Sequence, residues 1–294
     1  MDALAWAVCF TRSHRENFAV LSWFLPRDLR PGFAAVYAFC RTADDLADGH
    51  DGSAEGRAAA LDALGRTRDD LDATLAGRPP GEPLWRALAA AVDRYGLPAE
   101  PFHRLLDAFE QDQRVTRYAT LEQVLGYCRG SADPVGRLVL ALSGADRPDR
   151  RAASDATCTA LQLINHWQDV RRDLLERDRI YLPEAVAQRH GFDHAELADV
   201  VRGGREAGLV ERYAGAVREL CDDAATRFEA GRHLADEVGS GLRRPLRLFT
   251  AGGEAVLQTI RAQKHDTLTR RARVPAWRRT MVLAGAMLAR EGRR

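Results

Sequence analysis

The sequence predicts an all-α protein with a single helical domain over residues 1–294. Alanine, leucine and arginine, which are strong helix formers, recur at three- and four-residue spacing along most of the chain. The sequence has no convincing run of alternating β-branched residues of the kind that marks a half-buried strand. The breaks between helical patterns are too short for domain linkers, and 46% hydrophobic residues are enough for a large core.

Helices in the first half of the chain are expected over residues 14–25, 29–48, 51–77, 84–95, 99–114 and 121–143. Pro26 ends the first of them, and Gly49 follows the second at a position typical of a helix C-terminus. The loop R-P-P-G-E-P at 78–83 separates the third from the fourth. Small residues and Pro134 inside the last one predict a kink, from close helix packing or from a substrate channel.

Helices in the second half are expected over residues 149–176, in short pieces within 184–203, and over 206–236, 241–262 and 276–290. Gly203-Gly204 and the stretch from Gly239 to Gly241 supply the breaks. The stretch from Thr280 to Ala289 is apolar but much shorter than a membrane span, and arginines flank it. We expect this last helix to pack on the core, with contact to a membrane surface as the alternative.

Composition excludes several classes of function. The formal net charge is +1, so nothing drives the whole chain toward nucleic acid. Lys264 is the only lysine, which argues against Schiff-base and P-loop chemistry. The odd number of cysteines and the lack of CxxC spacing indicate a reducing compartment, and the first ten residues lack the basic start of a signal peptide. We therefore expect a cytoplasmic protein. The five cysteines are Cys9, Cys40, Cys128, Cys158 and Cys221.

Two acidic helix faces are the strongest functional signal. In N-H-W-Q-D-V-R-R-D, Asn165, Asp169 and Asp173 recur four residues apart and share one helix face. A second acidic face lies far upstream in D-D-L-A-D, which contains Asp44, Asp45 and Asp48. Each follows an apolar, aromatic-containing stretch of helix, so both faces point toward the interior. Oxygen-only ligands suit Mg²⁺, which usually completes its shell with a phosphate, and two such faces predict a shared magnesium site.

Other polar residues lie near these two motifs. Arg41 is one turn before Asp44 and could bind phosphate or pair with a neighbouring aspartate, and Tyr37 lies one turn earlier. Arg179 and Tyr181, in R-I-Y-L-P, follow closely enough to fold back over the site. Arg171 and Arg172 point away from Asp169, and we interpret them as surface residues. His166 lacks a partner at zinc spacing and is interpreted as a core or supporting histidine.

These motifs together resemble those of the squalene/phytoene synthase family, from about residue 10 to residue 290. The resemblance rests on Tyr37-Ala-Phe-Cys-Arg-Thr-Ala-Asp-Asp-Leu-Ala-Asp48, on Leu161 to Asp173 and on Arg179 to Pro183. It implies the isoprenoid synthase fold with a central cavity in a helical bundle. The residues it implies as metal or diphosphate ligands, or as their support, are Asp44, Asp48, Asp169, Asp173, Asp45, Gln162, Asn165, Arg41, Arg179, Tyr37 and Tyr181. The residues it implies as the lining of a hydrocarbon tunnel are Tyr127, Ser131, Ala132 and Gly136.

Within that family, Glu16-Asn17-Phe18 and Asn165 to Asp169 look most like the hydroxysqualene synthases of bacterial hopanoid biosynthesis. That resemblance implies ionisation of presqualene diphosphate and capture of the rearranged cation by water. Asn17 or Glu16 would orient the water, unless they only cap a helix or pair with Arg15 or Arg12. The alternative within the family is head-to-head coupling of two prenyl diphosphates to presqualene diphosphate, squalene, dehydrosqualene or phytoene. A non-catalytic helical assembly protein is the alternative of another class.

The same resemblance sets the expected cofactors and partners. Two or three Mg²⁺ ions are expected and NADPH is not. The substrate is a prenyl diphosphate or presqualene diphosphate, and the other partners are enzymes of the squalene and hopanoid pathway, without nucleic acid. A peripheral contact at the inner face of the membrane is compatible with an apolar C30 product.

Overall fold

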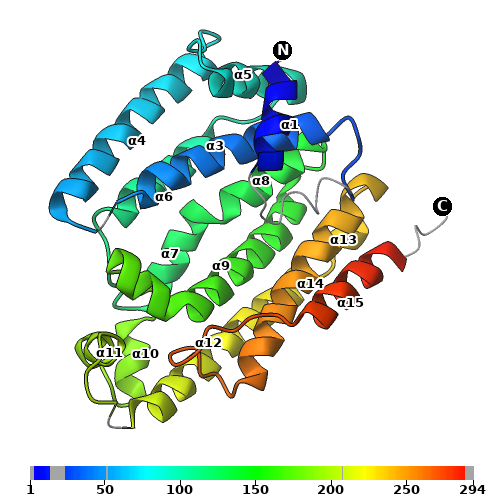
Figure 1. Cartoon of the computed structure of the whole chain (residues 1–294). Helices are drawn as coiled ribbons and strands as arrows, with labels where there is room; N and C mark the ends of the chain where they lie inside the picture. The colour runs from blue at the N-terminus through cyan, green and yellow to red at the C-terminus, as the bar shows by residue number, and fades with distance from the viewer. Residues whose placement is uncertain (1–2, 14–23, 51, 207, 289–294) are drawn as a thin grey trace.

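The longest helix of the described chain, α9 (Pro148–Arg177), runs through the middle of the molecule, and the other helices pack around it (Figure 1). The computed structural model describes residues 3–13, 24–50, 52–206 and 208–288, with the side chains of all of these except 12–13 and 283–288. These residues form no strand, and their one bridge is an isolated pairing of Arg117 with Ile180. The predicted all-α class is confirmed.

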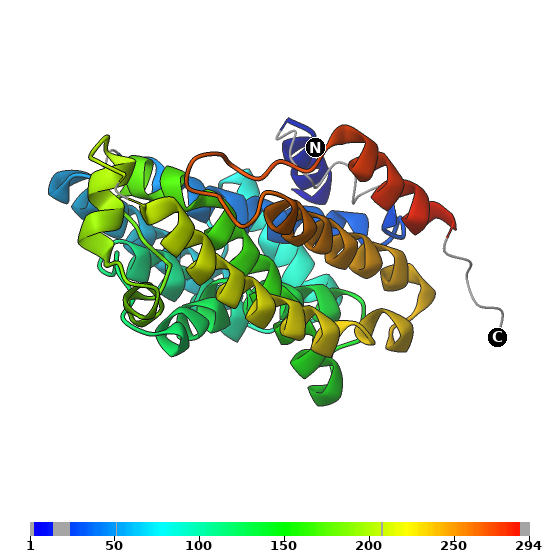
Figure 2. The same ribbon diagram turned by 90° about the horizontal axis from the view of Figure 1, so that it is seen from below.

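The remaining helices fall on two sides of α9. Those before it are α1 (Ala3–Ser13), α3 (Arg30–Asp48), α4 (Ala54–Leu75), α5 (Pro83–Tyr95), α6 (Glu100–Asp112), α7 (Leu121–Ser131) and α8 (Asp133–Leu142). Those after it are α10 (Glu184–Arg189), α11 (His194–Val201), α12 (Leu209–Gly231), α13 (Leu234–Glu237), α14 (Ser240–Ala262) and α15 (Ala276–Leu288). Figure 2 shows α15, in red, along one edge of the molecule, and α15 packs against α14.

Local signals in the sequence account for several helix ends. The Ser53 side chain accepts a hydrogen bond from the backbone N–H of Gly56 and caps α4. Thr120 and Gln123 form a reciprocal capping box at the start of α7. Gly96 adopts a left-handed conformation, with φ of 63°, and closes α5. Such caps satisfy backbone groups that a helix end leaves without intrahelical partners.

Two of the expected helices differ from the structure. The helix expected over 121–143 is divided at Ala132 into α7 and α8, because Pro134 has no backbone N–H with which to continue the hydrogen-bond ladder. The helix expected over 206–236 ends at Gly231, followed by the separate α13. Helix α1 was not predicted, since it is held by packing on α3 and α5. Most of the helix expected over 14–25 lies outside the described residues.

The buried apolar side chains form two large clusters. One joins α1, α3, α4, α5, α6 and α8, and includes Phe39, which packs edge-on against Phe102. The other joins α7, α9, α10, α11, α12 and α14 around Trp167 and Tyr213. A central cavity lies where α3 and α6 meet α7 and α9. In the described part of the chain, no helix has both the length and the apolar character needed to cross a membrane.

Candidate active site

The central cavity, of about 710 Å³, brings the two acidic faces together. Helix α3 contributes one face, and α9 contributes the other. The apolar wall between them includes Leu105, Phe109 and Val135. The predicted site residues that line this cavity are Tyr37, Arg41, Asp44, Asp45, Asp48, Tyr127, Ser131, Gln162, Asn165, Asp169, Asp173, Arg179 and Tyr181.

Two predicted tunnel residues are not among those that line the cavity. A Cβ atom added to Gly136 would come within 2.4 Å of Ser154 Oγ and 2.7 Å of Cys158 Sγ. Gly136 therefore allows α8 to approach α9 closely, as the packing alternative for this stretch predicted. Ala132 is buried at the junction between α7 and α8. Glu16, Asn17 and Phe18 lie outside the described residues.

Burial and repulsion between neighbouring carboxylates strongly raise the pKa values of two aspartates on the acidic faces. Burial and the neighbouring charge of Asp48 raise the pKa of Asp44 to about 6. Burial and the charge of Asp169 raise the pKa of Asp173 to about 7, and Asp48 on the opposite helix adds to that rise. Concentrated negative charge of this kind is costly without a cation. The cavity is therefore a site for positive charge.

Arginines supply part of that positive charge. Arg177 lies 3.0 Å from Asp48 and 3.4 Å from Asp173, so it bridges the two faces. Arg179 places Nη1 2.9 Å from Asp48. Asp169 accepts two hydrogen bonds from Arg271, which lies on the loop between α14 and α15, one of them 2.8 Å long. At the rim, Arg41 pairs with Asp45 at 2.6 Å.

These pairs bear on whether Mg²⁺ fits the cavity. Within the described residues, no three acidic, histidine or cysteine side chains converge as a preformed metal centre. The donors on the two faces are carboxylates and amides, which is the chemistry that Mg²⁺ prefers. Asp48, Asp169 and Asp173 now face arginines. The donor set fits Mg²⁺, provided that these guanidinium groups turn from the carboxylates toward an incoming anion.

Asp112, at the end of α6, is a functional candidate that the sequence analysis missed. Its carboxylate accepts hydrogen bonds from Tyr127 at 2.8 Å and from Tyr181 at 3.0 Å. Its backbone oxygen accepts one from Arg179 Nε at 3.2 Å. Burial raises the pKa of Asp112 to about 6, although the Arg179 charge opposes that rise. The position could have been noticed, because Asp112 shares a helix face with the apolar residues Leu105 and Phe109.

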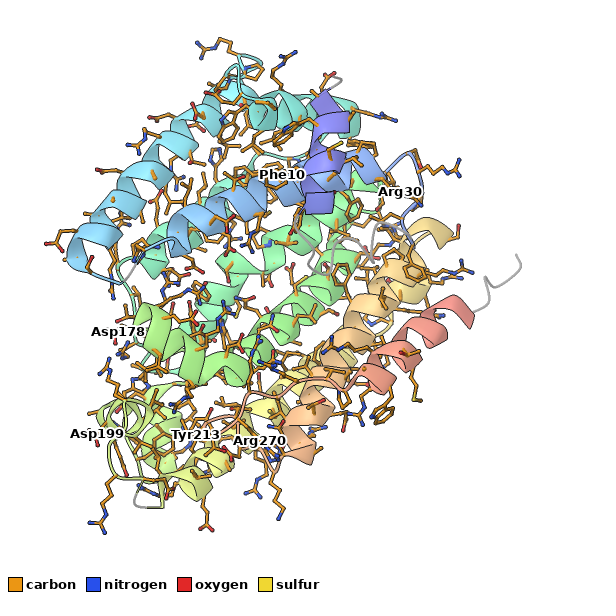
Figure 3. The ribbon with its side chains drawn as sticks, in the orientation of Figure 1. Phe10, Arg30, Asp178, Asp199, Tyr213 and Arg270 are labelled. Atoms are coloured by element: carbon orange, nitrogen blue, oxygen red, sulfur yellow. The ribbon has the colours of Figure 1, made fainter. Side chains whose placement is uncertain are left out.

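The turn after α9 holds Arg179 in the cavity. Asp178 has a left-handed backbone, with φ of 54°, which ends α9 and reverses the chain direction. Its side chain, labelled in Figure 3, accepts hydrogen bonds of 2.8 Å from both Arg117 and Arg202. Backbone N–H of Ile180 also donates to Thr116. These contacts direct Arg179 inward, where it is buried.

His166 forms part of the wall of the cavity. Its ring stacks on Tyr181 at a centroid distance of 3.7 Å and is 5% exposed. Burial lowers the pKa of His166 to about 3, so the ring is neutral. Within the described part of the chain, His166 Nε2 and Ser131 Oγ have no hydrogen-bond partner. Two buried polar atoms on the wall of one cavity leave room for a bound polar group such as water.

Two other arginines of the site were also missed. Arg177 lies four residues after Asp173 on the same face of α9, and this spacing was visible in the sequence. Arg271 is 102 residues from Asp169, and no sequence pattern links them. Arg171 and Arg172 are exposed, as predicted. Arg172 nevertheless lines the cavity and lies 3.8 Å from Asp169, so the prediction that it points away from Asp169 is wrong.

Known proteins are similar to this chain in sequence and in architecture. The family model for squalene/phytoene synthases matches residues 11–278. The chain is 32% identical to phytoene synthase from Thermus thermophilus, over 95% of this chain and 90% of that protein. It is 36% identical to hydroxysqualene synthase from Rhodopseudomonas palustris, over 77% of this chain and 73% of that protein. Squalene synthase HpnC from Alicyclobacillus acidocaldarius, a solved structure, has a TM-score of 0.79 and 41% identity, over 90% of this chain and 95% of that chain.

Proposed function

The chain belongs to the squalene/phytoene synthase family, and we propose that it converts presqualene diphosphate and water into hydroxysqualene and diphosphate. The observation that carries this proposal is the combination of two facing acidic helix faces with two polar atoms on the wall of the same cavity, His166 Nε2 and Ser131 Oγ, that have no hydrogen-bond partner within the described residues. The acidic faces suit a metal-bound diphosphate, and the polar atoms suit a water molecule. Relatives named hydroxysqualene synthase support the same choice.

In this proposal the rim of the cavity holds the diphosphate. Asp44, Asp48, Asp169 and Asp173, with Asn165, would hold two or three Mg²⁺ ions, which neutralise the leaving group when bound. Asp45 and Gln162 support that set. Arg41 and Arg179, already paired with these aspartates, would turn toward the phosphate oxygens. The positive charge of these arginines is then compensated by carboxylates in the free enzyme and by diphosphate in the complex.

Tyrosines that line the cavity would then stabilise the carbocation. The bond between carbon and the diphosphate oxygen breaks, and its electron pair leaves with diphosphate. Tyr37, Tyr127 and Tyr181 line the space where the rearranging cation would lie, and their ring faces favour positive charge. Burial raises the pKa of Tyr127 and Tyr181 well above the ordinary value, so these phenols stay protonated. Water then forms the new C–O bond, and its surplus proton passes to the released diphosphate.

Product analysis tests the proposed reaction. The purified full chain is incubated with Mg²⁺ and without NADPH, and presqualene diphosphate and farnesyl diphosphate are supplied separately. Hydroxysqualene from the first, carrying oxygen from labelled water, is expected, with no C30 product from the second. A C30 or C40 product made from prenyl diphosphates alone would instead assign the chain to head-to-head coupling. Mass spectrometry distinguishes these outcomes.

His166→Phe tests where the water binds. Phenylalanine keeps an aromatic ring against Tyr181 but removes Nε2. Loss of one hydrogen bond to the water should lower the ratio of alcohol to alkene products roughly three- to tenfold, from a bond worth about 1 kcal/mol. Consumption of presqualene diphosphate should change less. Ser131→Ala should lower the ratio of alcohol to alkene as well. His166→Asn, which keeps a polar group at this position, should give a ratio between those of His166→Phe and the wild type. An unchanged ratio in His166→Phe would contradict this assignment.

The cellular setting follows from the same proposal. We place the enzyme in the cytoplasm, next to enzymes of the squalene and hopanoid pathway that supply presqualene diphosphate and consume the C30 alcohol. A peripheral membrane contact would help to transfer such an apolar product. NADPH has no place in the proposed reaction, because water and not hydride ends it.

A further inference from the structure

The segment from residue 267 to residue 288 carries five arginines and no aspartate or glutamate. Arg270 and Arg273 lie on the loop before α15, and Arg278 and Arg279 lie in its first turn. Arg270, Arg273 and Arg279 are exposed, and none of them forms an ion pair within the described part of the chain. Figure 3 labels Arg270 at the start of this segment. The segment is strongly basic in a chain whose formal net charge is only +1.

Apolar side chains are exposed beside these arginines. Trp277 is 59% exposed and Met281 is 64% exposed, and they are the two most exposed large hydrophobic side chains in the described chain. They lie four residues apart on one face of α15. The Arg278 guanidinium stacks over the Trp277 ring at 5.3 Å. Both apolar side chains border a groove of about 860 Å³ between α12, α14 and α15.

The same segment reaches the rim of the central cavity. Arg271 pairs with Asp169, and the backbone oxygen of Ala272 accepts a hydrogen bond from Gln168. Figure 2 shows the segment, coloured orange to red, continuing from that loop along one edge of the molecule into α15. A surface that binds here would therefore lie close to the mouth of the cavity that takes the proposed substrate.

We propose that this segment, with Trp277 and Met281, binds the surface of an anionic lipid bilayer. Tryptophan is favoured at the boundary between headgroups and acyl chains, and methionine can enter the same layer. Arginines beside them attract anionic headgroups. Exposed apolar and basic groups alternate along this surface, as suits the boundary between lipid headgroups and acyl chains. A nucleic acid would interact with the basic groups but would leave the apolar side chains exposed. The proposal holds whichever family reaction the enzyme performs, because it depends on the outer surface alone.

Vesicle flotation with the full-length protein tests the proposal. Vesicles of phosphatidylcholine alone are compared with vesicles that also contain phosphatidylglycerol, at low and at high salt. We expect binding at least tenfold tighter to the anionic vesicles, because several arginines attract the anionic headgroups, and we expect most of that binding to be lost at high salt. Equal binding to both vesicle types, or none to either, would overturn the proposal.

Matched variants locate the contact. Arg278→Gln/Arg279→Gln and Trp277→Ser/Met281→Ser should each weaken binding to anionic vesicles about tenfold or more. Arg66→Gln/Arg86→Gln changes the charge equally on α4 and α5, on the other side of the molecule in Figure 1, and should leave binding unchanged. Because the replaced side chains are exposed, apart from the half-buried Arg278, thermal unfolding should stay close to that of the wild type. If the control variant weakens binding as much as the other two, or if Trp277→Ser/Met281→Ser instead dissociates a dimer, the lipid proposal is wrong.

Discussion

Replacing Asp169 with alanine is expected to lower turnover of the proposed substrate, presqualene diphosphate, on the order of a thousandfold or more, because the α9 face loses a carboxylate proposed to hold the metal. Asp48→Ala should have a comparable effect from the α3 face. The fold should persist, since Asp169→Ala removes a charge that repels Asp173. The thermal midpoint should stay the same or rise slightly. Steady-state release of diphosphate and a thermal melt measure the two parts of this prediction.

Asp149→Ala provides the matched control. Asp149 is an exposed aspartate in the first turn of the same helix, far from the cavity lining, and its nearest basic partner is Arg147 at 3.5 Å. Its replacement should leave turnover within about twofold, as surface changes usually do. Mg²⁺ with diphosphate should raise the thermal midpoint of the wild type but not that of Asp169→Ala. Retained turnover in Asp169→Ala would exclude this carboxylate from the metal site.

The sequence could predict much of the site because its strongest signals are local. The spacing of Asp44 and Asp48, and of Asp169 and Asp173, depends only on helical periodicity. Once two such faces follow apolar stretches, the core of a helical bundle is where they must meet. The family motifs contributed the residues between them, and almost all of these line one cavity. The proposed chemical roles of these residues remain predictions.

What could not be predicted depends on tertiary contacts. Arg271 reaches Asp169 only because the loop after α14 folds back over α9. Asp112 becomes the acceptor for two tyrosines only when α6 packs beside α7 and the turn after α9. For Gly136 the sequence left two alternatives, because small residues in a helix suggest either a channel or close helix packing. The close approach of Ser154 shows that the second applies. Long-range contacts of this kind leave little trace in local periodicity.

Arg179→Met should lower the free energy of unfolding by about 3–5 kcal/mol at neutral or higher pH. Methionine fills part of the space but leaves Asp112, which is 5% exposed, without the charge that now compensates it. Removing one partner of a buried pair costs far more than removing an exposed one. Arg202→Met is the comparison, because Arg202 also lies 2.8 Å from an aspartate but its side chain is 53% exposed. That variant should lose less than about 1 kcal/mol.

The pH dependence of the free energy lost in Arg179→Met shows whether Arg179 stabilises the fold through its charge or through packing. Burial already raises the pKa of Asp112 from 3.8 to about 6, and loss of the opposing Arg179 charge should raise it further. A carboxyl with a raised pKa contributes stability below its ordinary pKa, and this contribution is lost as the pH rises through the folded-state value. The deficit of Arg179→Met should therefore be small near about pH 5 and largest near about pH 8. Urea unfolding at both pH values, repeated with Arg179→Met/Asp112→Asn, measures it. The double variant should recover most of the lost unfolding free energy at the higher pH, because no buried charge remains at position 112. If the loss is equal at both pH values, or is not relieved in the double variant, Arg179 stabilises the fold through packing and not through its charge.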